Sequence, residues 1–110
     1  MERLNKDFKR EISAILSSMK DARVNEFLSV SRVEVTSDLS YAKVYIGSVM
    51  GYQQAQEACG VLAGAEGYIK STLAKTLRIR KIPKLQFIAD NVVESYYRIQ
   101  NILEGLKDEH

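Results

Sequence analysis

Residues 53–77 read QQAQEACGVLAGAEGYIKSTLAKTL, and apolar side chains recur through this stretch every three or four residues. Such spacing predicts helix, with one side turned toward a core. Gly60, Gly64 and Gly67 interrupt the pattern, and each costs about 1 kcal/mol relative to alanine in a helix interior. The stretch therefore predicts two helices that meet at a break near residues 64–67, rather than one straight helix.

A β-hairpin is predicted before this pair of helices. Residues 28–36 and 41–49 are rich in β-branched and aromatic side chains, and the turn-forming sequence TSDLS lies at 36–40. The second strand alternates cleanly, and its apolar face consists of Ala42, Val44 and Ile46. The first strand changes phase half-way, which predicts either a bulge near Ser31 or Arg32 or a strand that is buried partly on both faces.

A helix precedes the hairpin, and a third strand follows the helical pair. Apolar residues from Leu4 to Met19 share one face of an amphipathic helix that we expect over residues 4–20. Pro83 opens a short strand, because a proline in the first strand position need not donate to the sheet, and alternation continues to Ala89.

A last helix is predicted after the third strand. Asp90 or Asn91 can cap it, and its buried stripe is Val92, Tyr96, Ile99, Leu103 and Leu106. The predicted order is α-β-β-α-α-β-α. This order indicates an α+β fold, with a three-stranded sheet that carries its helices on one face.

The length of 110 residues suits a single domain, which we expect over residues 1–110, with 107–110 as a frayed tail. No apolar run approaches the roughly 18 residues of a membrane-spanning helix, and no signal-peptide pattern opens the chain. Cys59 is the only cysteine, so no intramolecular disulfide can form. We expect a cytoplasmic protein that does not associate with membranes.

Positive charge is concentrated in one stretch, although the net charge is only +2. Residues 66–84 hold one acidic side chain, Glu66, and six basic ones, Lys70, Lys75, Arg78, Arg80, Lys81 and Lys84. One or two cations would suffice to complement the dipole at the end of a helix. Six exceed that need, and a local field of this kind attracts the phosphates of nucleic acid. Among the tyrosines, we expect Tyr68 to lie near bound RNA.

Catalytic and metal chemistry have no support in the sequence. His110, the only histidine, is terminal and has no other metal ligands clustered with it. Cys59 lies on the apolar side of a predicted helix, where we expect a small buried hydrophobic residue rather than a nucleophile. The chain has neither a GxxxxGK[ST] nor a GxGxxG motif, and its carboxylates show no paired spacing. We therefore expect no enzyme activity, no cofactor, no metal and no small-molecule substrate.

Five segments, taken in order, are similar to bacterial ribosome-binding factor A along nearly the whole chain. They are DARV at 21–24, VEVTSDLSYAKVY at 33–45, AEGYIK at 65–70, LRIR at 77–80 and PKLQFIAD at 83–90. The resemblance implies a type II KH-like domain in which an Ala-x-Gly kink, here Ala65-Glu66-Gly67, replaces the usual GXXG loop. Ala22 departs from the family, which commonly has proline there.

The resemblance also implies a function. Members of this family bind the free small (30S) ribosomal subunit and assist late maturation of its 16S rRNA without catalysis, especially in the cold. We therefore expect a monomer whose partner is 16S rRNA within the free 30S subunit. The expected RNA-binding residues are the six cations above, Ala65 and Gly67 at the kink, and Lys6, Lys9, Arg10 and Arg23 near the N-terminus.

Two other functions remain open on the residues alone. One is a protein-interaction module on the outer face of the hairpin, with Arg32, Glu34, Lys43 and Tyr45 as its contacts. The other is an enzyme, which would need a pocket with convergent polar groups.

Overall fold

The structure is a computed structural model that describes residues 2–91. Its elements are α1 (Glu2–Ser18), β1 (Leu28–Val35), β2 (Tyr41–Ser48), α2 (Tyr52–Gly64), α3 (Glu66–Leu77) and β3 (Lys84–Ala89). The predicted order is confirmed from the first helix through the third strand. The predicted last helix from Val92 onward and the tail at 107–110 lie outside the described residues.

The three strands form one sheet in the order β1-β2-β3. β1 and β2 are antiparallel, as a hairpin requires, whereas β3 runs parallel to β2 after the chain has crossed through α2 and α3. The register between β1 and β2 shifts between Val30 and Arg32. The predicted bulge is therefore present, and it explains the change of phase in the first strand.

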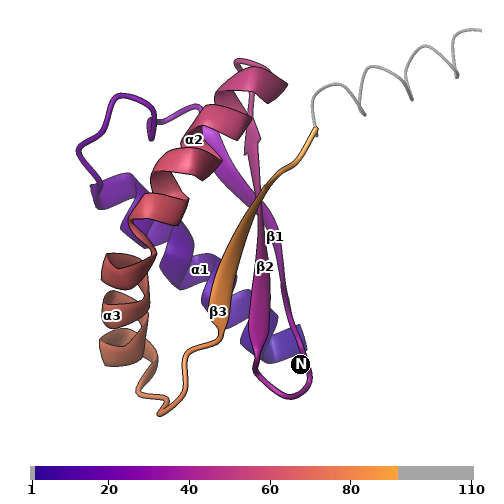
Figure 1. The fold of residues 1–110 in the computed structure, drawn as a ribbon, viewed down its shortest axis with the longest axis vertical. Coiled ribbons are helices and arrows are strands. Elements are labelled where there is room, and N and C mark those ends of the chain that lie inside the picture. The colour runs from indigo at the N-terminus through magenta and orange to yellow at the C-terminus, as the bar shows by residue number, and fades with distance from the viewer. Residues whose placement is uncertain (1, 92–110) are drawn as a thin grey trace, which may run out of the picture.

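The core lies between the sheet and the three helices of residues 2–91. One face of the sheet is buried, and α1 and α2 pack against it, with α3 packed on α1. The helices contribute to the core Phe8, Ile12, Ile15, Leu16, Leu62, Ile69 and Leu73. Each fully buried side chain of this size stabilises the fold by roughly 1.5–3 kcal/mol. Figure 1 shows α2 and α3 following one another along the same side of β3.

The junction of α2 and α3 is a kink through a single residue. Ala65, with φ −99° and ψ 13°, separates the helices. Its N–H donates to the carbonyls of Val61 (3.2 Å) and Leu62 (3.0 Å), and its own carbonyl accepts from the N–H of Ile69 (3.0 Å). The hydrogen-bond ladder therefore continues through the junction, and no exposed four-residue loop forms. This geometry confirms the predicted break and the Ala-x-Gly kink.

Candidate nucleic-acid interface

We call the six cations between residues 70 and 84 the basic segment. They lie on α3, in the connection to β3 and at the first residue of β3. α3 ends where Arg78 adopts a left-handed conformation, with φ 54° and ψ 38°, and donates its N–H to the Ala74 carbonyl at 3.1 Å. This residue turns the chain away from the helix axis. Arg78 thus stands at the negative end of the helix dipole, where a cation is favoured.

Most of the basic segment is exposed and lacks a carboxylate partner. Lys75, Arg78, Arg80, Lys81 and Lys84 are exposed, and only Lys70 is half-buried. The ion pairs found within residues 2–91 all involve other cations. These side chains are therefore free to contact phosphates without first breaking a salt bridge.

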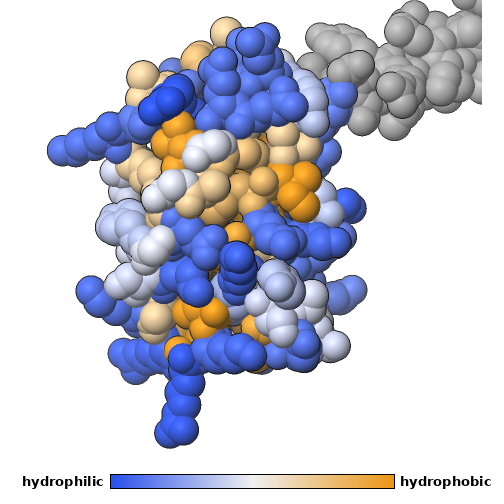
Figure 2. All heavy atoms as spheres, in the orientation of Figure 1, coloured by the Kyte–Doolittle hydropathy of each residue, from blue (hydrophilic) through white to orange (hydrophobic). Residues whose placement is uncertain are grey.

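The segment between α3 and β3 lies at the same end of the molecule as the hairpin turn. The Lys84 N–H donates to the Ser40 carbonyl at 3.0 Å, so the start of β3 is fixed beside the turn. Figure 1 places both at the lower end, below α3. In Figure 2, hydrophilic side chains project from this end and surround a few apolar atoms. The cations of the basic segment that follow α3 therefore gather at this end, together with the Asp38 carboxylate of the turn.

The kink lies at the other end of α3 from Arg78. α3 has 12 residues, which corresponds to about 18 Å at 1.5 Å per residue. Gly67 is exposed, and a Cβ built on it would meet nothing within 4 Å, so an approaching ligand backbone has room there. Ala65 is half-buried, and the ring of Tyr68 is 58% exposed, as RNA contact would require. The kink and the cations that follow α3 therefore lie at opposite ends of one helix.

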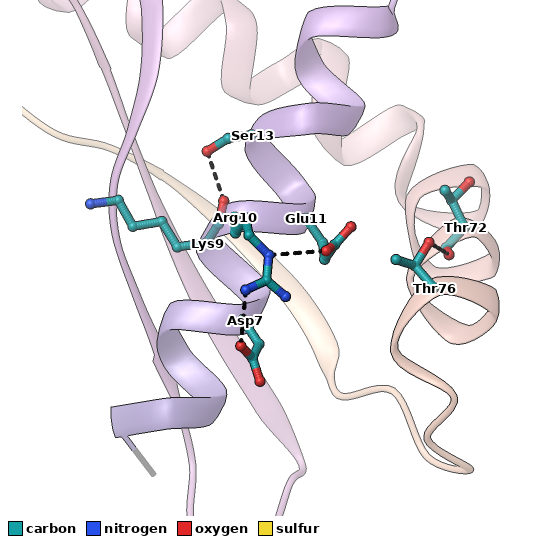
Figure 3. A network of polar contacts seen from close by, with 7 residues as sticks. All are labelled: Asp7, Lys9, Arg10, Glu11, Ser13, Thr72 and Thr76. Carbon is teal, nitrogen blue, oxygen red and sulfur yellow. Dashed lines mark hydrogen bonds and ion pairs between the residues drawn. The ribbon is translucent and has the colours of Figure 1, made fainter.

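Arg10 and Arg23, two of the predicted N-terminal cations, are held by carboxylates. Arg10 lies 3.4 Å from Asp7 and 3.2 Å from Glu11, as Figure 3 shows, and Arg23 lies 3.3 Å from Asp21. The Arg23 backbone N–H, and then its guanidinium, lower the pKa of Asp21. These pairs are exposed and therefore weak, but they offset the charge that phosphate would meet.

Lys6 and Lys9 face a different part of the surface from the basic segment. They line a shallow groove of about 350 Å³ between α1 and β1, together with Ser31 and Arg32. In Figure 3 the Lys9 side chain points from α1 away from α3. The structure thus divides the predicted binding residues into two groups, and their common role in binding stays a prediction.

The described residues show neither a reactive thiol nor a group of metal ligands. Cys59 is half-buried rather than fully buried, and desolvation raises the pKa of its thiol to about 11, so the thiol stays protonated at neutral pH. Within residues 2–91 no three potential metal-ligating side chains are grouped, and no helix is long and apolar enough to cross a membrane. His110 lies outside the described part of the chain.

Residues 1–103 match the family model described as ribosome-binding factor A. The chain belongs to the ribosome-binding factor A family. The ribosome-binding factor A of Treponema denticola is 38% identical to it over 109 residues, which span 97% of this chain and 83% of the relative.

Solved structures of ribosome-binding factor A share the fold. The crystal structure of the Thermus thermophilus protein superposes with a TM-score of 0.71 at 26% identity, covering 80% of this chain and 92% of that one. A Thermus thermophilus homology model fitted into a cryo-electron-microscopy map of a 30S complex gives 0.68 at 26% identity, covering 81% and 93%. The predicted KH-like α+β fold is thereby confirmed.

One exposed aromatic residue on the sheet, Tyr41, was not selected by the sequence argument for RNA binding. Tyr41 is 43% exposed on the outer face of the sheet, beside Lys84. Among the tyrosines, the sequence singled out Tyr68, not Tyr41. Its alternation with Ala42 in β2 was the available signal, because it puts Tyr41 on the face away from the core.

Proposed function

We propose that this protein is a non-enzymatic ribosome assembly factor that binds the free small (30S) ribosomal subunit and assists late maturation of its 16S rRNA. The proposal rests on one observation: the exposed cations of the basic segment lie at one end of the fold and have no carboxylate partner within residues 2–91. A relative with the same fold has been fitted into a map of a 30S complex, which supports the choice of partner.

The mode of binding follows from the kink. A GXXG loop would bring backbone N–H groups close to the phosphates of single-stranded RNA, whereas here the helical ladder runs through Ala65. We infer that the basic segment and the exposed backbone at Gly67 contact a folded rRNA surface by its shape and charge. Lys6 and Lys9, and more weakly the paired Arg10 and Arg23, supply a second contact.

The mechanism is differential binding. A factor that contacts one arrangement of the rRNA better than another shifts the population toward the first, by as much as its two affinities differ. No bond needs to be made or broken by the protein. The proposal includes a single-domain monomer that acts in the cytoplasm and matters most in the cold.

Co-sedimentation with purified 30S subunits at rising salt tests the proposal. Arg78→Glu with Arg80→Glu should abolish most of the binding, because each reversal turns a phosphate contact into a repulsion. Arg3→Glu with Lys20→Glu changes the net charge equally at two exposed positions outside the predicted set, and it should bind nearly as well as the wild type. Equal binding by both double variants would refute the proposed surface.

A further inference from the structure

The outer face of the sheet turns away from the core, and no element within residues 2–91 covers it. Exposed and buried side chains alternate in the part of the sheet nearest the hairpin turn, over residues 32–35, 41–46 and 84–86. The central strand β2 supplies Tyr41, Lys43 and Tyr45. The registers align Tyr41 with Lys84 and Tyr45 with Arg32, so each ring has a cationic neighbour on an adjoining strand.

The first aromatic platform is Tyr41. Its side chain is 43% exposed, which is high for a residue in the central strand of a sheet. Lys84 is paired with it on β3, and Lys43 follows two residues along the same face. Both lysines are exposed, and neither forms an ion pair among the described residues. Lys43 lies opposite Glu34 on β1, whereas Lys84 lies opposite Tyr41 itself. A flat ring beside the Lys84 ammonium group suits a base with its flanking phosphate.

The second platform is already assembled without a ligand. The Arg32 guanidinium lies 4.2 Å from the centroid of the Tyr45 ring, and its Nε is 3.6 Å from the Glu34 carboxylate. The Arg32 side chain remains 60% exposed, so the guanidinium, stacked on the ring, is open to further stacking. Planar guanidinium groups stack on bases much as aromatic rings do.

Charge alone does not select RNA for this face. Glu34 offsets Arg32, and Asp90 lies nearby, where its carboxylate accepts a hydrogen bond from the Ser31 hydroxyl at 2.7 Å. Lys84, however, belongs both to this face and to the basic segment. A strand of RNA whose phosphates contact Arg80 and Lys81 is therefore led directly onto Tyr41.

We propose that the outer face of the sheet binds unpaired nucleotides of RNA. Tyr41 stacks on one base, the Arg32 guanidinium stacks on another, and Lys43 and Lys84 contact the phosphates. This inference rests on the proposed RNA-binding function and deepens it, because it adds single-stranded RNA to the structured surface that the basic segment contacts. The same face docking a protein instead is an outcome that the test can return.

The test is the binding of the folded full-length chain to a fluorescent oligouridylate of about 12 nucleotides, a length within the range that single-stranded sites span. Tyr41→Ala should weaken binding roughly 5- to 150-fold, the range for loss of one stacked base. Tyr41→Phe keeps the ring and should bind like the wild type. Tyr52→Ala is the matched control, because Tyr52 is 42% exposed at the start of α2, away from this face.

Ring resonances of the tyrosines give an independent readout. On addition of the oligouridylate, the Tyr41 ring signals should shift upfield, whereas those of Tyr52 should not move. Equal oligonucleotide binding by the Tyr41→Ala and Tyr52→Ala variants, or no binding by the wild type, would overturn the inference. So would a Tyr41→Ala variant that loses 30S binding but keeps the oligonucleotide, which would indicate a protein contact. None of these results touches the proposed function, which is tested by Arg78→Glu with Arg80→Glu.

Discussion

Arg78 occupies a backbone conformation that glycine normally fills. Its φ of 54° costs a residue with a Cβ about 1–2 kcal/mol, and the helix dipole returns only about 0.3–1 kcal/mol to a cation placed there. Stability therefore does not explain arginine at this position. Under the proposed function, the guanidinium at this charged end of the fold contacts a phosphate of the rRNA.

Replacement of this residue separates folding from binding. Arg78→Gly should leave the free energy of unfolding unchanged or raise it by up to about 1 kcal/mol, because strain is removed while a favourable charge is lost. The same variant should bind 30S subunits more weakly. Urea unfolding and co-sedimentation measure the two effects. A marked loss of stability with undiminished binding would show that Arg78 is structural.

Asp38 in the hairpin turn gives the fold a defined response to acid. Hydrogen bonds from Ser40 and from the Thr36 hydroxyl lower the pKa of its carboxyl to about 2. Because the folded-state pKa lies below the unfolded one, these bonds stabilise the fold above about pH 4, and their contribution is lost as the pH falls toward 2.

Asp38→Asn should accordingly lower the Tm at neutral pH, and the difference from the wild type should close between about pH 4 and 2. Thermal unfolding followed by circular dichroism across this range measures the effect. Glu26→Gln, at an exposed carboxylate without a hydrogen bond among those found within residues 2–91, is the control. A difference in Tm that stays constant down to pH 2 would contradict the assignment.

Hydrogen bonds between residues distant in sequence could not be predicted from individual residues. Asp90 was expected as a helix cap, and the helix in question lies outside the described residues. Within the described residues its carboxylate accepts a hydrogen bond from Ser31, 59 positions earlier. Such a contact depends on the bulge in β1 and on the pairing of β2 with β3, so no local pattern contains it.

Most of the helices and strands were predictable because their hydrophobic periods are clean outside the change of phase in β1 and the glycines of α2 and α3. The bulge, the hairpin turn and the break at Ala65 follow from local residues. The ends of the first helix were not predicted correctly, because residues 4–20 were expected and Glu2–Ser18 is observed. Helix ends depend on capping contacts of a few residues, which periodicity does not report.

Replacing one glycine in α2 and one in α3 distinguishes an effect on stability from an effect on 30S binding. A Cβ at Gly60 or at Gly67 would meet nothing within 4 Å, so alanine fits at both positions. Gly60→Ala, inside α2, should stabilise the protein by about 1 kcal/mol and leave 30S binding unchanged. Gly67→Ala should also not destabilise the fold, but it should weaken binding if rRNA approaches the backbone there. Equal binding of 30S subunits by both variants would show that the backbone at the kink does not contact rRNA.

At the scale of the whole molecule, the fold separates two ends. The basic segment and the hairpin turn form one end. At the other end, Val49, Met50 and Tyr52 are exposed where β2 leads into α2, and the exposed Phe27 lies beside Val49 just before β1. The concentration of charge was readable from the sequence, because it is local in the chain. The separation of Lys6 and Lys9 from the basic segment was not, because it depends on which side of α1 faces α3.

Salt dependence should distinguish the two groups of cations. Each phosphate contact that is lost lowers the slope of log K against log salt by about 0.7–0.9. Arg80→Ala with Lys81→Ala should therefore reduce the magnitude of the slope for 30S binding by roughly 1.4–1.8. Lys6→Ala with Lys9→Ala measures the contribution of the α1 groove in the same way. An unchanged slope for the first pair would exclude these side chains from phosphate contact.

The most direct test of the account is photo-crosslinking from the two ends of the molecule on purified 30S subunits. A benzoylphenylalanine placed at position 80 lies at the charged end, and one placed at position 52 lies at the opposite end. The account predicts that position 80 crosslinks to 16S rRNA and that position 52 does not. Crosslinking of 16S rRNA from position 52 alone would contradict it.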